Sequence, residues 1–61
     1  MTAHRPTPQT TIDAIIYSVC ERGLIALKEP ANLNRLSHCD KAAKAEINKR
    51  IEGLLTKGML L

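Results

Sequence analysis

The sequence predicts an all-α fold, a small three-helix domain in which a short helix lies between two long ones. Apolar residues recur at three- and four-residue spacing in the first and last thirds of the chain, which is the signature of helices with one buried face. Residues suited to begin a helix precede the predicted segments, and no alternating apolar and polar pattern of a strand occurs. We therefore predict a single helical domain over residues 10–61, helix-turn-helix-like in one interpretation, after a flexible N-terminal arm over residues 1–9.

The first helix is predicted over residues 10–22. Thr10 and Asp13 match a capping box, in which the hydroxyl accepts from the amide three residues on and the carboxylate reaches back. A start with Thr7 as the cap and Pro8 as the first helical residue is the alternative. The face predicted to be buried consists of Ile12, Ile15, Ile16, Val19 and Cys20.

The middle of the chain predicts a helix end followed by a short helix. Arg22 and Gly23 fit the C-terminus of the first helix, a cation followed by a residue free to adopt a positive φ. Residues 24–27 fit either a buried helical turn or an extended stretch. Pro30 suits a first helical turn, so that a second helix is predicted over residues 30–38. Its inward residues are expected to be Leu33 and Leu36, and its solvent-facing residues Asn32, Asn34 and Arg35.

The last helix is predicted over residues 41–57. Asp40 is a strong N-cap residue, and the following residues are good helix formers. Gly58 ends the helix, whereas Gly53 lies inside it and marks either a close helix contact or nothing. The apolar stripe of this helix contains Ala43, Ile47, Ile51, Leu54 and Leu55.

Length and composition limit the core. The chain has 61 residues, no Phe and no Trp, and Tyr17 is its only aromatic residue. A single core in so small a domain rarely supplies more than about 3–5 kcal/mol without disulfides, a metal or a partner subunit. We therefore expect the chain to complete its core against another chain, as a homodimer or with a protein partner.

Composition also bears on compartment and partners. The net charge of +3 is compatible with nucleic acid or with an acidic protein surface. The N-terminal residues have no apolar segment of a signal peptide, and the longest apolar run, Leu24 to Leu27, is far short of the ~20 residues that span a bilayer. Cys20 and Cys39 are expected to be reduced, largely buried thiols. These features predict a cytoplasmic protein without a membrane partner.

No enzymatic, metal or cofactor site can be assembled from the sequence. His4 lies in the arm, and His38 and Cys39 are adjacent, whereas a nucleophile and its base are expected to meet from separate elements. Paired zinc ligands at short spacing and a glycine-rich phosphate loop are both missing. We expect a non-enzymatic protein without a cofactor.

Two surfaces are candidates for partner binding. The apolar stripes of the long helices predict a seam for a protein partner or a second copy, with the residues Ile16, Val19, Ile47, Ile51, Leu54 and Leu55. The last helix carries the surplus of positive charge and predicts contact with nucleic acid or an acidic partner, or else an ordinary solvated face. The contact residues are expected to be Arg5, Lys41, Lys44, Asn48, Lys49 and Arg50, with His4 from the arm.

Two segments of the chain resemble known groups of proteins. Residues 47–60, with a leucine pair, a Lys-Gly turn and a following apolar residue, resemble the end of the recognition helix in winged-helix regulators. That resemblance implies that Lys41, Lys44, Asn48 and Lys49 lie near a DNA groove. Residues 11–14, 21–24, 26–31 and 35–36 are similar to short uncharacterised proteins of alphaproteobacterial genomes and their mobile elements. Small proteins of such elements often bind and modulate a larger protein.

Two functional hypotheses follow. The first is a regulatory protein that acts by protein–protein binding, as a modulator or inhibitor of a larger host, plasmid or phage protein. The alternative is a small DNA-binding transcriptional regulator that uses the basic helix 41–57.

Overall fold

The computed structural model describes residues 7–60, and this part of the chain is all-α, without strands. Its elements are α1 (Gln9–Arg22), the 3₁₀ helix η1 (Leu24–Lys28), α2 (Pro30–Ser37) and α3 (Lys41–Thr56). The predicted order of a long, a short and a long helix is confirmed, and η1 resolves the ambiguity of residues 24–27 as a helical turn.

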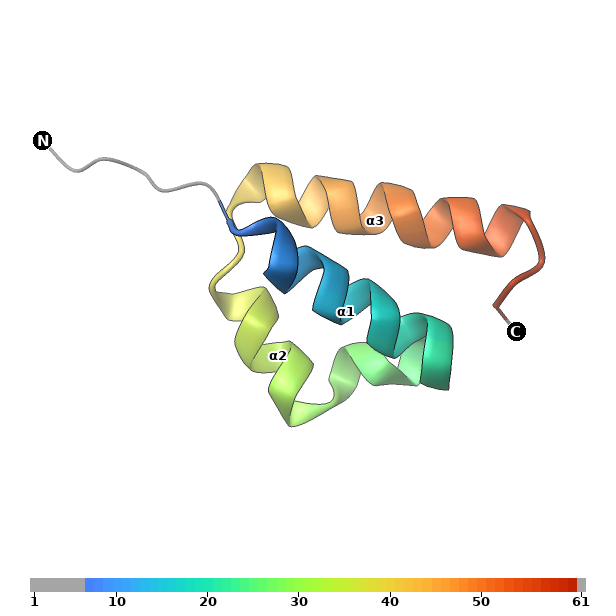
Figure 1. Cartoon of the computed structure of the whole chain (residues 1–61), viewed down its shortest axis with the longest axis horizontal. Coiled ribbons are helices and arrows are strands. Elements are labelled where there is room, and N and C mark those ends of the chain that lie inside the picture. The colour runs from blue at the N-terminus through green and yellow to red at the C-terminus, as the bar shows by residue number, and fades with distance from the viewer. Residues whose placement is uncertain (1–6, 61) are drawn as a thin grey trace, which may run out of the picture.

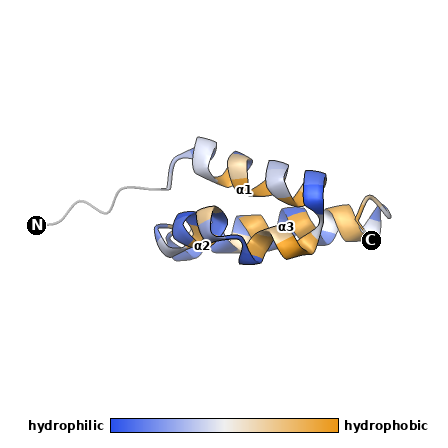
Figure 2. Ribbon diagram, turned by 90° about the horizontal axis from the view of Figure 1, so that it is seen from below, coloured by the Kyte–Doolittle hydropathy of each residue, from blue (hydrophilic) through white to orange (hydrophobic). Residues whose placement is uncertain are grey.

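The central element is α1, which contacts η1, α2 and α3 (Figure 1). Seen from the side, α1 forms one layer, and α2 and α3 lie at the level of a second layer (Figure 2), on opposite sides of α1 in the view of Figure 1. The hydrophobic residues of α1 face this second layer (Figure 2). The core between the layers is aliphatic and consists of Ile12, Ile15, Ile16, Val19, Ala26, Cys39, Ala43, Ile47, Ile51 and Leu60, flanked by Leu27, Leu36 and Leu54.

The start of α1 differs from the predicted capping box. The helix begins at Gln9, and no side chain caps it; instead the Pro8 carbonyl accepts from the Thr11 amide at 3.0 Å. Thr10 therefore lies inside the helix, where its hydroxyl cannot act as a cap. Thr7 lies before the helix, but its hydroxyl bonds to Asp40 and not to the first turn of α1. Residues 1–6 of the predicted arm lie outside the described residues.

The helix end at Gly23 is confirmed. The Gly23 amide donates to the Val19 carbonyl at 2.8 Å, and Gly23 has a φ of 86° and a ψ of −173°. This backbone conformation is accessible essentially to glycine alone. It turns the chain directly into η1, which returns along α1.

The orientation predicted for α2 is right for Leu36 and Asn34 and wrong for Asn32 and Leu33. Asn32 is fully buried, and Leu33 is 52% exposed; Leu36 is half-buried against the core as predicted. The Asn32 amide donates to the Ala26 carbonyl at 2.9 Å, and its oxygen accepts from the Arg35 guanidinium at 2.7 Å. The buried Ala26 carbonyl of η1 accepts from the Glu29 amide at 3.1 Å, and Asn32 supplies its second donor.

The predicted start of α3 is confirmed, since the Asp40 carboxylate accepts from the Ala43 amide at 2.8 Å. The helix ends at Thr56, and Gly58, with a φ of 71°, follows it. Gly53 does not mark a close helix contact, because a Cβ atom at this position would meet nothing within 4 Å. The prediction that Cys20 is buried on the apolar face of α1 is wrong, because its side chain is exposed.

Candidate functional site

The solvent side of α3 carries a cationic face, which we define as Lys41, Lys44, Asn48 and Lys49. All four side chains are exposed. Residues three and four positions apart lie on one side of a helix, so Lys41, Lys44 and Asn48 form one stripe with Lys49 beside it. The burial of Ala43, Ile47 and Ile51 orients this stripe, because these residues hold another side of α3 in the core.

The charges of α3 that face α1 are neutralised. The Arg50 guanidinium lies 3.1 Å from the Asp13 carboxylate and 3.7 Å from that of Glu46. Gln9 Nε2 donates to both carboxylates. The hydrogen bond from Arg50, followed by that from Gln9, lowers the pKa of Asp13 below its usual range. Arg50, predicted as a contact residue, therefore joins α3 to α1 and is not part of the cationic face.

The lysines of the cationic face differ from Arg50 in the part of the chain that the structure describes. Within residues 7–60, Lys41, Lys44 and Lys49 form no ion pair. Glu46, the acidic residue in the first turns of α3, is engaged by Arg50 and Gln9. Positive charge therefore accumulates on the N-terminal half of α3.

The turn before α3 fixes the cationic face relative to α2. Three residues, His38, Cys39 and Asp40, separate the two helices. The Cys39 side chain is buried and its thiol donates to the Arg35 carbonyl at 3.3 Å, while burial raises the pKa of this thiol. On the other side, Thr7 bonds to Asp40. The first turn of α3 is thus held by contacts with α2 and with the residues before α1.

A lateral hollow adjoins the cationic face. It has a volume of about 330 Å³ and is lined by Leu27, Leu36 and Ile47 together with Lys44 and Asn48. Its floor is apolar, and two members of the cationic face form part of its wall. The hollow lies where η1 and α2 approach α3.

The predicted apolar seam is largely the core of the chain itself. Ile16, Val19, Ile47 and Ile51 are at most 8% exposed. They pack in one cluster, against which the half-buried Leu54 also packs. Of the six seam residues, only Leu55 is an exposed side chain, at 44%. In this conformation Leu55 is therefore the one residue of the predicted seam that a partner could reach as an exposed side chain.

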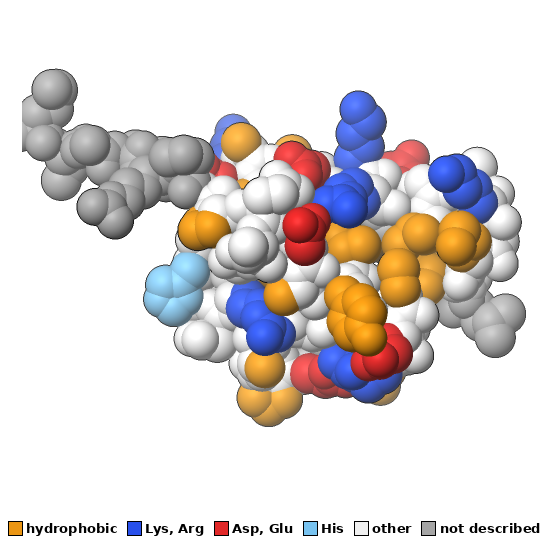
Figure 3. Space-filling view, in the orientation of Figure 1, with side chains coloured by type: hydrophobic (Ala, Val, Ile, Leu, Met, Phe, Trp, Pro, Cys, Tyr) orange, Lys and Arg blue, Asp and Glu red, His pale blue; other side chains and the backbone are white. Residues whose placement is uncertain are grey.

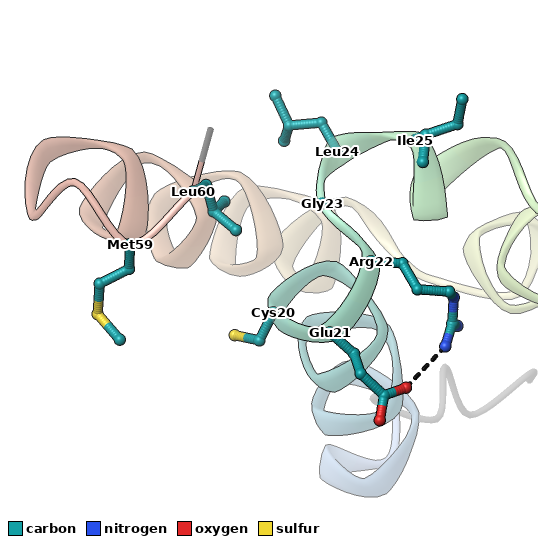
Figure 4. A pocket seen from close by; sticks show the side chains of 8 residues that line it. All are labelled: Cys20, Glu21, Arg22, Gly23, Leu24, Ile25, Met59 and Leu60. Carbon is teal, nitrogen blue, oxygen red and sulfur yellow. Dashed lines mark hydrogen bonds and ion pairs between the residues drawn. The ribbon is translucent and has the colours of Figure 1, made fainter.

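A second hollow lies at the other end of α3, and we call it the C-terminal hollow. It has a volume of about 500 Å³ and is lined by residues 20–25, Met59 and Leu60 (Figure 4). Figure 3 shows hydrophobic side chains gathered on this face of the molecule, beside the end of α3. Ile25 is 70% exposed and Met59 65%. The sequence predicts no binding surface here, although a short helical turn cannot bury every residue of an apolar run such as 24–27.

The residues considered for catalysis or metal binding do not converge. His38 Nδ1 lies 2.8 Å from the Asn34 carbonyl, and the Cys39 thiol bonds to a different carbonyl. In the part of the chain that the structure describes, no group of three or more His, Cys, Asp or Glu side chains is placed to hold a metal ion. His4 and Arg5 lie outside the described residues.

Comparison of the chain with protein-family models, with curated proteins and with solved structures found no significant match. None of the helices within residues 7–60 combines the length and apolarity needed to cross a bilayer. The cationic face and the two hollows are therefore the features from which a function can be inferred.

Proposed function

We propose that this chain is a small non-enzymatic regulatory protein that binds duplex DNA through the cationic face of α3. The observation that carries the proposal is the separation of charge on this helix. Lys41, Lys44 and Lys49 are exposed without an ion pair among residues 7–60, whereas Glu46 and Arg50 are paired on the side of α1. Unpaired lysines on one helix face suit phosphate binding, which releases counterions from the duplex.

The shape of the surface supports the same proposal. An α-helix with its side chains is about 10–12 Å in diameter and enters the major groove, which is about 12 Å wide. Ala42 and Ala45 are exposed between the lysines, and their small side chains permit a close approach of the backbone. The short helix, three-residue turn and long helix over residues 30–56 are also the order of a helix-turn-helix unit, in which the second helix enters the groove.

Within this proposal the residues have different roles. Lys41, Lys44 and Lys49 contact phosphates, which position the protein without reading sequence. Asn48 lies between them, and its amide can donate one hydrogen bond to N7 of an adenine and accept one from the N6 amino group of the same base. Asn48 is therefore the candidate for base readout.

Fluorescence anisotropy with a labelled duplex at several salt concentrations tests the proposal. The double variant Lys44→Gln and Lys49→Gln should weaken binding and make the slope of log K against log salt shallower by about 2, because each phosphate contact contributes roughly one unit. The matched control is Lys28→Gln with Lys57→Gln, which removes the same charge from positions outside the cationic face. The proposal would be contradicted if both double variants lost the same amount of DNA affinity, or if the unmodified chain did not bind the duplex at low salt.

The lateral hollow favours a second candidate function, the modulation or inhibition of a larger protein. An apolar floor of Leu27, Leu36 and Ile47 beside Lys44 suits an amphipathic helix with acidic flanks. Calorimetric titration with such a model helix, and with an equally acidic peptide that lacks apolar residues, tests this function. Binding that requires the apolar residues supports it, and equal binding of both peptides contradicts it.

A further inference from the structure

We propose that the C-terminal hollow is the docking surface for a second copy of this chain. The hollow combines a recess and protruding side chains. Ile25 and Met59 are 70% and 65% exposed, and both border a hollow of about 500 Å³. In Figure 4 the Cys20 side chain points toward the side of the hollow where Met59 lies, with Leu60 between Met59 and the end of α1.

The combination of recess and protruding residues fits an isologous contact. In a two-fold dimer the same surface is used by both copies, so each copy must supply both halves of every contact. Here each copy supplies a recess and the exposed side chains of Ile25 and Met59 to fill the recess of the other. A partner with only a protruding segment would leave these side chains uncovered.

The charges at the rim favour a second copy as well. The charged residues that line the hollow are Glu21 and Arg22, one acid and one base, whose side chains pair at 2.8 Å. Arg22 also pairs with Glu29 at 2.6 Å, so the charges of the rim are balanced within one copy and two identical rims meet without repulsion. A strongly acidic or basic partner would find no surplus of opposite charge at this surface.

The position of the hollow leaves the cationic face free. Lys41 and Lys44 lie in the first turn of α3, whereas Met59 follows the C-terminal end of this 16-residue helix. Such a helix is about 24 Å long, which exceeds the Debye length of about 8–10 Å at moderate salt. The dimer therefore leaves both cationic faces accessible, and the lysine nearest to the contact in sequence is Lys57.

The number of exposed apolar side chains is small, so the dimer is expected to be weak and to dissociate on dilution. Sedimentation velocity over a wide range of protein concentration tests this, and it requires no DNA, so that its outcome is independent of the proposed function. The unmodified chain should shift from monomer to dimer as the concentration rises. A monomer at every concentration would overturn the proposal.

Matched variants locate the surface. Met59→Glu and Ile25→Glu should each abolish the dimer and keep the helical circular dichroism, because both side chains are exposed in the monomer. Leu33→Glu makes the same change at an exposed leucine of α2 that does not line the hollow, and it should leave the dimer intact. If Leu33→Glu lost the dimer while Met59→Glu and Ile25→Glu kept it, the C-terminal hollow would not be the dimer contact.

Thiol cross-linking provides a second measurement. Cys20 is exposed and lines the hollow, whereas Cys39 is buried. A short bis-maleimide reagent should cross-link two copies of the chain through Cys20. The cross-linked dimer should be absent in Cys20→Ser and strongly reduced in Met59→Glu. Cross-linking that persists unchanged in Met59→Glu would place the contact elsewhere and overturn the proposal.

Discussion

Thr7 and Asp40 form a pair of hydrogen bonds that joins the residues before α1 to the start of α3. Thr7 Oγ1 donates to the Asp40 carboxylate at 3.2 Å and accepts from the Asp40 amide at 3.0 Å. The same carboxylate caps α3 through the Ala43 amide. Thr7 thus supports the cap of the helix that carries the cationic face, although the two residues are 33 positions apart in the sequence.

Replacing Thr7 by Val should reduce the free energy of unfolding by about 1–3 kcal/mol, because two hydrogen bonds are lost at a net value of roughly 0.5–1.5 kcal/mol each. Asp40→Ala should cost more, since it also removes a cap with a typical value of ~1 kcal/mol. Urea unfolding followed by circular dichroism measures both. Thr7→Ser is the control, because it keeps the hydroxyl, and it should remain close to the unmodified chain.

The buried amide of Asn32 gives the second prediction. Asn32→Leu removes one of the two donors to the buried Ala26 carbonyl, which keeps its hydrogen bond from the Glu29 amide, and should lower the free energy of unfolding by about 0.5–1.5 kcal/mol. Asn34→Leu, at an exposed position of the same helix, should change it by less than about 0.5 kcal/mol. Equal melting temperatures of the two variants would show that the bond to Ala26 does not stabilise the fold.

The two glycines Gly23 and Gly53 should respond to alanine in opposite directions. At Gly23, with a φ of 86°, alanine adopts a strained backbone and should cost about 1–3 kcal/mol. At Gly53 a Cβ atom meets nothing within 4 Å, and alanine in a helix interior should add about 0.8–1 kcal/mol of stability. Thermal unfolding of both variants measures the contrast, and a stabilised Gly23→Ala variant would contradict the assigned backbone conformation.

The Asp13–Arg50 pair predicts a pH-dependent contribution to stability. The pKa of Asp13 is lowered from 3.8 in the folded state, so the pair stabilises the fold above that value and its contribution is lost as the pH falls through the folded pKa. The stability difference between the unmodified chain and Asp13→Asn should therefore be present at neutral pH and shrink below about pH 4. Because both side chains are exposed, the difference should also decrease with added salt.

The matched control for this experiment is Glu52→Gln. Glu52 is an exposed carboxylate of α3 that forms no ion pair with the residues described. Its replacement should leave stability nearly unchanged at neutral pH. A loss as large as that of Asp13→Asn would show that net charge, and not the pair, determines the effect.

The features that depend on local sequence were predictable. Asp40 marks the start of α3 and Gly23 the end of α1. Each forms its hydrogen bond with a residue three or four positions away in the sequence. The period of three and four residues was sufficient to place Ile12, Ile15, Ile47 and Ile51 in the core. For the same reason the exposure of Lys41, Lys44, Asn48 and Lys49 followed from the opposite side of α3.

The features that depend on distant partners were not predictable. Arg50 cannot be told apart from the neighbouring lysines by sequence, because only the tertiary fold brings Asp13, 37 positions away, beside it. The orientation of α2 follows from the bond that Asn32 makes to the Ala26 carbonyl and not from the leucines of this short helix. The C-terminal hollow required both the 3₁₀ geometry of residues 24–28 and the return of Leu60 to the core.

The central position of α1 has a consequence for biosynthesis. The ribosome makes α1 before every element that covers it, and Leu60, which also packs in the core, emerges long after. At about 5–20 residues per second, the synthesis of residues 23–60 takes roughly 2–8 s. Until α3 has been made, Ile12, Ile15 and Val19 cannot be buried in the native core, so the folding of this domain waits for its C-terminal helix.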